Sequence, residues 1–102
     1  MPEPVVIAPE GELDLHSVDT LAPQLDEAAG ADYPHLVLDL SAVTLVDSTA
    51  LGAIAQVQHR FDRRGRRLSV VAPPGSAAAV LLELTGLRSR FALLASRDAA
   101  SP

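Results

Sequence analysis

The chain contains no cysteine, so it has neither a disulfide framework nor a cysteine-ligated zinc site. It also has no tryptophan and only one tyrosine and two phenylalanines, which leaves alanine, valine and leucine to fill a core. No apolar run approaches the roughly 18–20 residues that a membrane span needs. The first residues, Met1 to Pro4, carry acid and proline where a signal peptide carries basic and apolar blocks. These absences predict a cytoplasmic protein with no membrane partner.

Lysine is absent as well, and the positive charge is confined to one part of the chain. Residues 1–59 hold ten of the thirteen carboxylates and no arginine, whereas residues 60–102 hold all eight arginines. An acidic surface repels nucleic acid and suits a partner with a basic patch. The arginines at 60, 63, 64, 66 and 67 could indicate RNA or DNA binding. We favour the solvated last turn of a helix, because no set of aromatic residues alternates with them to stack on bases.

The apolar pattern predicts strands over residues 5–8, 35–40, 68–72 and 90–94, and a turn or short strand over 11–14. Helical spacing predicts helices over 16–30, from 47 to 64, and over 76–86. Residues 41–46 are expected to be a connection. Strands that alternate with helices predict a single α/β domain with a small mixed, mostly parallel sheet packed against helices. Its core spans about residues 5–95, and residues 96–102 are expected to form a frayed tail.

Two of the helices carry special residues. Pro23 lies inside the first helical pattern, so that helix either begins late, near Thr20, or kinks, and we favour an irregular first turn. Ser76 is expected to cap the third helix and Gly86 to end it. The residues of that helix that we expect to face inward are Val80, Leu81 and Leu84.

The middle helix is the clearest in the chain and carries the candidate site at its start. Its apolar positions recur on one face at Ala50, Leu51, Ile54, Val57 and Phe61. Gly65 ends it in the left-handed conformation. Asp47 or Ser48 can cap the helix, since its first N–H groups lack helical partners. The Ser48 hydroxyl also suits phosphorylation, because a helix start tolerates the phosphate while the outer surface, where a partner docks, gains negative charge.

Three segments resemble one known family. They are Gly11-Glu12-Leu13-Asp14, followed by Leu21; the run LDLSAVTLVDSTALG at 38–52; and Leu84-Thr85-Gly86-Leu87. The first resembles the GELD entry to a first helix, the second resembles a signature usually written D-S-S-G-L-G, and the third resembles the close of the third helix. On these segments the chain resembles a STAS domain of the anti-sigma-factor antagonist type, a family of bacterial regulatory switches of transcription.

The resemblance implies a function in partner switching. Unmodified protein would bind an anti-sigma factor that is itself a serine kinase, displace the sigma factor, and be released when the kinase phosphorylates Ser48. A separate phosphatase would reset it. By the same resemblance Asp47 shapes the loop and Asp14 contributes to the partner surface. The residues expected at that surface are Asp14, Asp47, Ser48, Thr49, Ala50 and Leu51.

Two positions depart from the family pattern. Thr49 stands in place of the second serine and is an alternative phosphoacceptor. Ala50 stands in place of the glycine; its methyl group favours a regular helix and could crowd docking by the kinase.

Other chemistries are not indicated. His16, His35 and His59 fall on three different elements without metal-ligand spacing, and no glycine-rich phosphate loop is present. Nothing resembles a nucleophile elbow, so we expect no enzyme activity, no metal and no cofactor. Two alternatives stay open. One is an unphosphorylated STAS scaffold or adaptor of a signalling or transport assembly, and the other, which we rank last, is a small-molecule or nucleotide-binding module.

Overall fold

The chain forms a four-stranded parallel sheet in the order β1-β3-β5-β6. The computed structural model describes residues 4–30 and 35–100. The strands are β1 (Val5–Ile7), β3 (His35–Asp39), β5 (Arg67–Val71) and β6 (Ala92–Leu94). The helices are α1 (Val18–Gly30), α2 (Ser48–Arg63) and α3 (Ala77–Thr85). This confirms the predicted α/β fold with a mostly parallel sheet.

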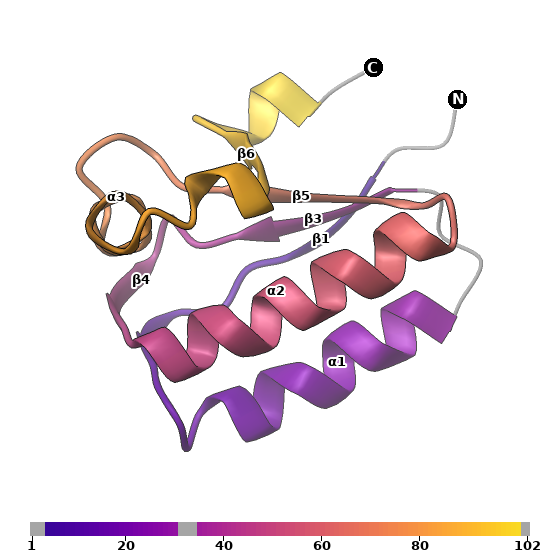
Figure 1. The fold of residues 1–102 in the computed structure, drawn as a ribbon, viewed down its shortest axis with the longest axis horizontal. Helices are drawn as coiled ribbons and strands as arrows, with labels where there is room; N and C mark the ends of the chain where they lie inside the picture. Colours follow the sequence, from indigo (N-terminus) through magenta and orange to yellow (C-terminus); the bar gives the residue numbers. More distant parts are fainter. Residues whose placement is uncertain (1–3, 31–34, 101–102) are drawn as a thin grey trace.

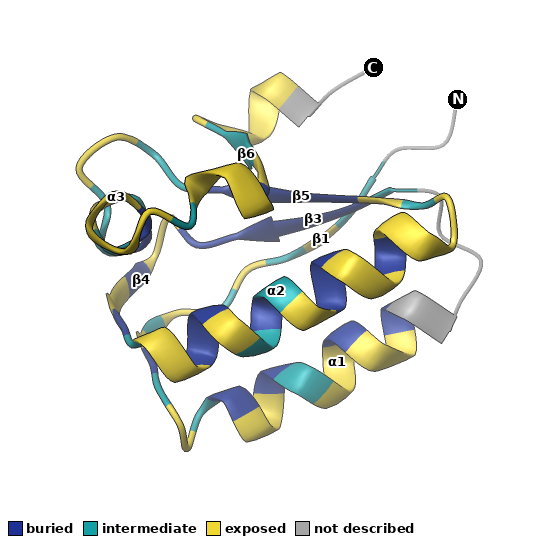
Figure 2. Cartoon of the chain, in the orientation of Figure 1, coloured by how far each residue is buried: buried dark blue, intermediate teal, exposed yellow. Residues whose placement is uncertain are grey.

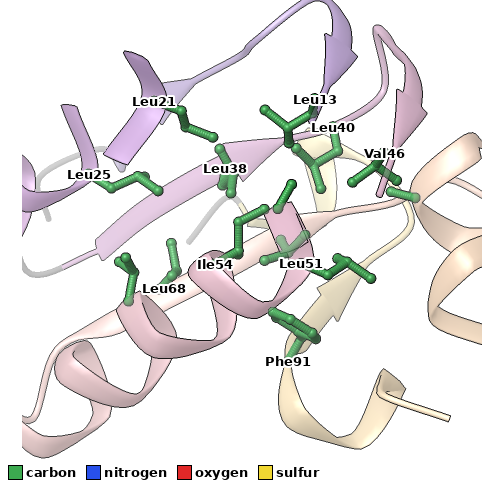
Figure 3. Packing of buried hydrophobic residues seen from close by; sticks show 14 of the residues in the cluster. Leu13, Leu21, Leu25, Leu38, Leu40, Val46, Leu51, Ile54, Leu68 and Phe91 are labelled. Atoms are coloured by element: carbon green, nitrogen blue, oxygen red, sulfur yellow. The ribbon is translucent and has the colours of Figure 1, made fainter. Parts of the chain in front are cut away.

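Helices α1 and α2 lie side by side under one face of this sheet, with their N-terminal ends at the same side of the molecule (Figure 1). Alternate residues of the central strands point at them, and these are buried leucines and a valine. They are Leu36, Leu38, Leu68 and Val70. From the helices, Leu21, Leu25, Leu51 and Ile54 meet them to form the core (Figure 3). The apolar stripe of α2 predicted from spacing is therefore the face that holds the helix against the sheet.

A second, two-stranded parallel sheet lies beside the first, and half of it was not predicted. Strand β2 (Gly11–Leu13) pairs with β4 (Val43–Val46), with Leu13 opposite Val46. The short strand expected near residues 11–14 is confirmed. The prediction of a plain connection over 41–46 is wrong. Val43 and Val46 are buried while Thr44 and Leu45 are exposed, a pattern that simple alternation does not show.

Helix α1 begins earlier than the late start near Thr20 that Pro23 suggested. It starts at Val18, two residues before Thr20, and contains Pro23 in its sixth position. The turn before it is closed by hydrogen bonds around Asp14 and Ser17, so the irregular part precedes the helix. The late start is therefore wrong, because the backbone carbonyls of Asp14, His16 and Ser17 accept hydrogen bonds from the N–H groups that open the helix.

The third helix has the predicted ends but a different buried face. Ser76 caps it by accepting a hydrogen bond from the Ala79 N–H at 3.2 Å, and Gly86 ends it at φ 72°. Its buried residues are Ala78 and Leu82, whereas Val80 is 47% exposed and Leu84 80% exposed. The prediction that Val80 and Leu84 face inward is wrong. The helix is apolar around much of its circumference, so spacing alone did not select the face.

Residues 97–100 form a 3-10 turn in a segment that was expected to be part of a frayed tail. After a 3-10 turn, η1 (Arg88–Arg90), and strand β6, a second 3-10 turn, η2 (Arg97–Ala100), contacts β3 and β6. Its Arg97 forms an ion pair with Asp39, whose side chain is buried. The sheet face opposite α1 and α2 contains buried residues, among them Val37 and Val71. Residues 97–100 therefore belong to the packed structure.

Candidate functional site

Two loops meet at the edge where β2 and β4 end. Because the two strands are parallel and Leu13 lies opposite Val46, the residues that follow them leave the sheet at the same place. The Asp47 N–H donates a hydrogen bond to the Leu13 carbonyl at 3.1 Å, which joins the two loops. Asp14 and Asp47, distant in sequence, thus belong to one surface, as expected.

The Asp47 carboxylate holds this surface together. One oxygen, Oδ1, accepts a hydrogen bond from the Ala50 N–H at 2.8 Å and caps α2. The other, Oδ2, accepts from the Leu15 N–H at 3.2 Å, in the loop after β2. Asp47 is therefore the cap of the helix and a bridge between the loops. The cap of α2 is therefore Asp47 and not Ser48.

Asp14 organises the first loop from within. Its Oδ1 accepts hydrogen bonds from the N–H groups of His16 at 2.9 Å and Ser17 at 3.0 Å. The Ser17 hydroxyl donates to the Glu12 carbonyl at 2.8 Å and accepts from the Asp14 N–H. The bond from the Ser17 N–H is the main cause that lowers the pKa of Asp14 below its ordinary value. Asp14 therefore presents a negative charge next to the start of α1.

Ser48 and Thr49 form the exposed first turn of α2 (Figure 2). The first helical hydrogen bond, from the Leu51 N–H to the Asp47 carbonyl at 3.1 Å, lies beyond them. Helix starts carry N–H donors without helical partners and the positive end of the helix dipole. Ser48 is thus an exposed residue at a helix start, where such donors lie.

Two of the residues expected at the partner surface face inward instead. Ala50 is 0% exposed and Leu51 1% exposed, and both belong to the core. The expectation that they contact a partner is therefore wrong as far as their side chains are concerned. It also follows that the Ala50 methyl group packs inside the protein and does not crowd a docking partner.

Sequence reasoning missed two exposed leucines near the site. Leu15 is 57% exposed in the loop that Asp47 bridges, and Leu45 is 52% exposed on β4. Exposed apolar side chains are the kind that form the apolar centre of a protein interface, inside a polar rim. The sequence could have indicated that Leu15 is exposed, because it lies between Asp14 and His16, in a predicted loop and outside any periodic pattern. Leu45 carried no such signal.

The three histidines lie on different parts of the fold. Of the three histidines, His35 is hydrogen bonded to Ser69 at 2.9 Å, and His16 and His59 are exposed. Within residues 4–30 and 35–100, no group of three potential metal ligands comes together.

A hollow of about 550 Å³ lies between β1 and α1 and is lined in part by Glu10 and Glu12. Two carboxylates suit a nucleotide phosphate poorly. In the same part of the chain, no helix has the length and apolar character to cross a bilayer.

Fold and site together define a small parallel-sheet α/β module with a hydroxyl-bearing helix start at a pair of strand ends. The chain belongs to the STAS domain family, whose sequence model matches residues 1–100. A relative named anti-sigma F factor antagonist, from Paenibacillus polymyxa, is 33% identical over 86 residues, or 81% of this chain and 71% of the relative.

Solved structures agree with that assignment. The crystal structure of an anti-sigma factor antagonist from Mycobacterium paratuberculosis is 30% identical, with a TM-score of 0.81 over 93% of this chain and 80% of that one. A sulfate transporter family protein from Wolinella succinogenes has a TM-score of 0.74 over 99% of this chain and 86% of that one, at 17% identity. The second likeness is one of fold alone. The fold therefore occurs in proteins with different names, and the site must decide the function.

The bridging role of Asp47 leads to a prediction with a matched control. Asp47→Ala should lower the free energy of unfolding by about 1–2 kcal/mol, because the cap of α2 is lost. It should also weaken partner binding, because the loop at Leu15 loses its tie. Ser76→Ala removes the equivalent cap of α3 and should cost a similar amount of stability without affecting binding. Urea denaturation and calorimetric titration measure the two effects. Equal binding by both variants would show that Asp47 is a cap and nothing more.

Proposed function

We propose that this chain is an anti-sigma-factor antagonist that binds an anti-sigma serine kinase while Ser48 is unmodified. The kinase uses ATP to phosphorylate Ser48, which ends the interaction, and a separate phosphatase restores the binding form. The observation that carries the proposal is the exposed Ser48 hydroxyl in the first turn of α2, directly after the bridging Asp47. A relative at 33% identity and a solved structure at 30% identity, both named anti-sigma factor antagonists, support it.

The physical basis of release is the charge that the phosphate adds. A phosphoserine carries a charge near −2 at neutral pH, and here it would lie beside Asp47 and in the same surface as Asp14. The free N–H groups of the helix start stabilise the phosphate, so α2 is expected to stay folded. A partner seated over Ser48 would meet a dianion that did not exist when it bound. The fold persists and the interface is lost.

The direct experiment combines the chain with purified anti-sigma serine kinases of its source organism and ATP. Intact mass spectrometry should show one added phosphate, and peptide mapping should place it on Ser48. A phosphate on Thr49 would keep the switch but move it by one residue. No phosphate with any kinase that binds the chain would contradict the proposal.

The second candidate is an unphosphorylated scaffold or adaptor in a signalling or transport assembly, where Ser48 only opens the helix. The fold is shared with a sulfate transporter family protein, so the fold by itself does not distinguish this candidate from the first. Binding to the same kinase with no phosphate transfer at any residue would select this candidate.

A further inference from the structure

The exposed face of α2 continues from Ser48 into a groove. Ser48, Gly52 and Gln56 follow one another at four-residue intervals, so they form one stripe along the helix, and all three are exposed. The groove has a volume of about 710 Å³ and lies between this stripe and the segment that contains η1. Leu87 and Ala55 supply apolar parts of its lining. The surface on which Ser48 lies is therefore longer than the helix start alone.

Gly52 is the unusual residue of the stripe. It lies in the interior of α2, where glycine is unfavourable compared with alanine. A Cβ atom built on Gly52 would meet nothing within 4 Å, and the residue does not have a positive φ. Neither packing nor backbone conformation within the chain requires a glycine here. A glycine on an exposed helix face does, however, permit another backbone to approach closely.

The rim of the groove is positively charged. Its charged lining residues are Arg60 and Arg90, while Asp47 caps the start of α2 at the other end of the stripe. Arg60 also pairs with Asp26 at 2.6 Å, in an exposed ion pair that leaves other guanidinium N–H groups for a second acceptor. The surface is thus negative at the start of α2 and positive towards its end. A bound segment with carboxylates would be held in one orientation, with its acidic end away from Ser48.

A buried acceptor lies beside the groove. Gln58 is 5% exposed; its amide nitrogen donates to Asp62 at 3.2 Å, and its Oε1 has no hydrogen-bond partner among the described residues. It lies at an adjoining hollow of about 240 Å³ that shares Arg90 and His59 with the groove. A buried unpaired acceptor costs free energy. A backbone N–H of a docked segment would supply the missing donor and remove that cost.

We propose that this groove receives an acidic amphipathic segment of the same kinase that phosphorylates Ser48, with the backbone of that segment passing over Gly52. The inference rests on the proposed function for the identity of the partner, and it adds a second contact that the Ser48 switch does not require. The segment places an apolar side chain against Leu87 and Ala55 and carboxylates beside Arg60 and Arg90.

Calorimetric titration with the kinase that binds the wild-type chain tests the groove. Arg90→Glu should weaken binding at low salt by roughly tenfold or more and reduce its dependence on salt. Arg88→Glu changes an exposed arginine of the same 3-10 turn, outside the groove, and should bind within about twofold of wild type. Gly52→Leu should also weaken binding by roughly tenfold, since its side chain occupies the path of the segment. Gly52→Ala, which favours the helix, should raise the melting temperature and still bind less tightly.

The outcomes separate the two proposals. If Ser48→Asp loses binding while Arg90→Glu and Gly52→Leu bind as wild type, the groove proposal is wrong and the proposed function stands. If Arg90→Glu weakens binding while Ser48→Asp does not, the groove stands and the switch is wrong. Equal losses from Arg88→Glu and Arg90→Glu would show general attraction and overturn the groove. So would a change of mass in sedimentation caused by Arg90→Glu, since the occupant would then be a second copy of the chain.

Discussion

Replacing Ser48 by aspartate is expected to weaken binding of the anti-sigma kinase by roughly tenfold to several hundredfold, with no loss of the fold. Such a loss corresponds to about 1.4 to 3.5 kcal/mol, within the range of a desolvated contact between like charges. The new carboxylate would lie beside Asp47, at a position that is exposed in the free protein. Because negative charge is favourable at a helix start, the melting temperature should stay the same or rise slightly.

The chain offers a control for the added charge. Ser76→Asp places a carboxylate at the start of α3, where aspartate can still cap the helix in place of the serine hydroxyl. It should bind the kinase as wild type does. Ser48→Ala should bind normally and stay bound after ATP is added. Release of Ser48→Ala by ATP at the normal rate would identify Thr49 as the acceptor, and unchanged binding by Ser48→Asp would contradict the charge mechanism.

Replacing Arg97 by alanine is expected to lower the free energy of unfolding by about 1–3 kcal/mol at pH 7, because a buried carboxylate loses its partner. Asp39 is 5% exposed, and Arg97 and the Ser41 hydroxyl donate hydrogen bonds to its two oxygens. Burial raises the pKa of Asp39, but these hydrogen bonds outweigh it, and the pKa lies below its ordinary value. The Arg97 side chain is 55% exposed, so solvent screening keeps the effect below that of a fully buried pair.

The pH dependence of this effect follows from the direction of the shift. A carboxyl group with a lowered pKa in the folded state stabilises the fold above its unfolded pKa, and that contribution is lost as the pH falls through the folded pKa. The difference in stability between wild type and Arg97→Ala should therefore be largest at neutral pH and shrink as Asp39 is protonated. Urea denaturation at a series of pH values measures it, with Arg88→Ala as the exposed control. A difference of zero at pH 7 would mean that the tail is frayed after all.

Periodicity identified the elements that bury a single stripe and failed where the pattern was ambiguous. The stripe from Ala50 to Phe61 predicted the packed face of α2, because one side of that helix is apolar and the other polar. Helix α3 is apolar on several sides, so Val80 and Leu84 were assigned inward although only Ala78 and Leu82 are buried. Strand β4 was missed because its buried residues, Val43 and Val46, do not alternate.

The features of the candidate site that lie within one segment of the sequence were predictable, and the bonds between distant segments were not. An aspartate and a serine before an apolar stripe predict a helix cap at one of the two residues, and Asp47 is the one that caps α2. The bridge from Asp47 to the Leu15 N–H joins residues 32 apart, and no local pattern predicts such a bond. The same is true of the ion pair between Asp39 and Arg97, 58 residues apart, which joins the turn over residues 97–100 to the sheet. The groove beyond Gly52 likewise depends on where η1 packs.

The most direct measurement compares the affinity of one kinase for the unmodified chain and for the chain fully phosphorylated on Ser48. We expect the phosphorylated form to bind at least tenfold more weakly. Its amide NMR spectrum should change only for residues near the start of α2 and the loop after β2. Equal affinity of the two forms, or a spectrum that shows an unfolded α2, would contradict the claim that charge at this helix start controls docking on an unchanged fold.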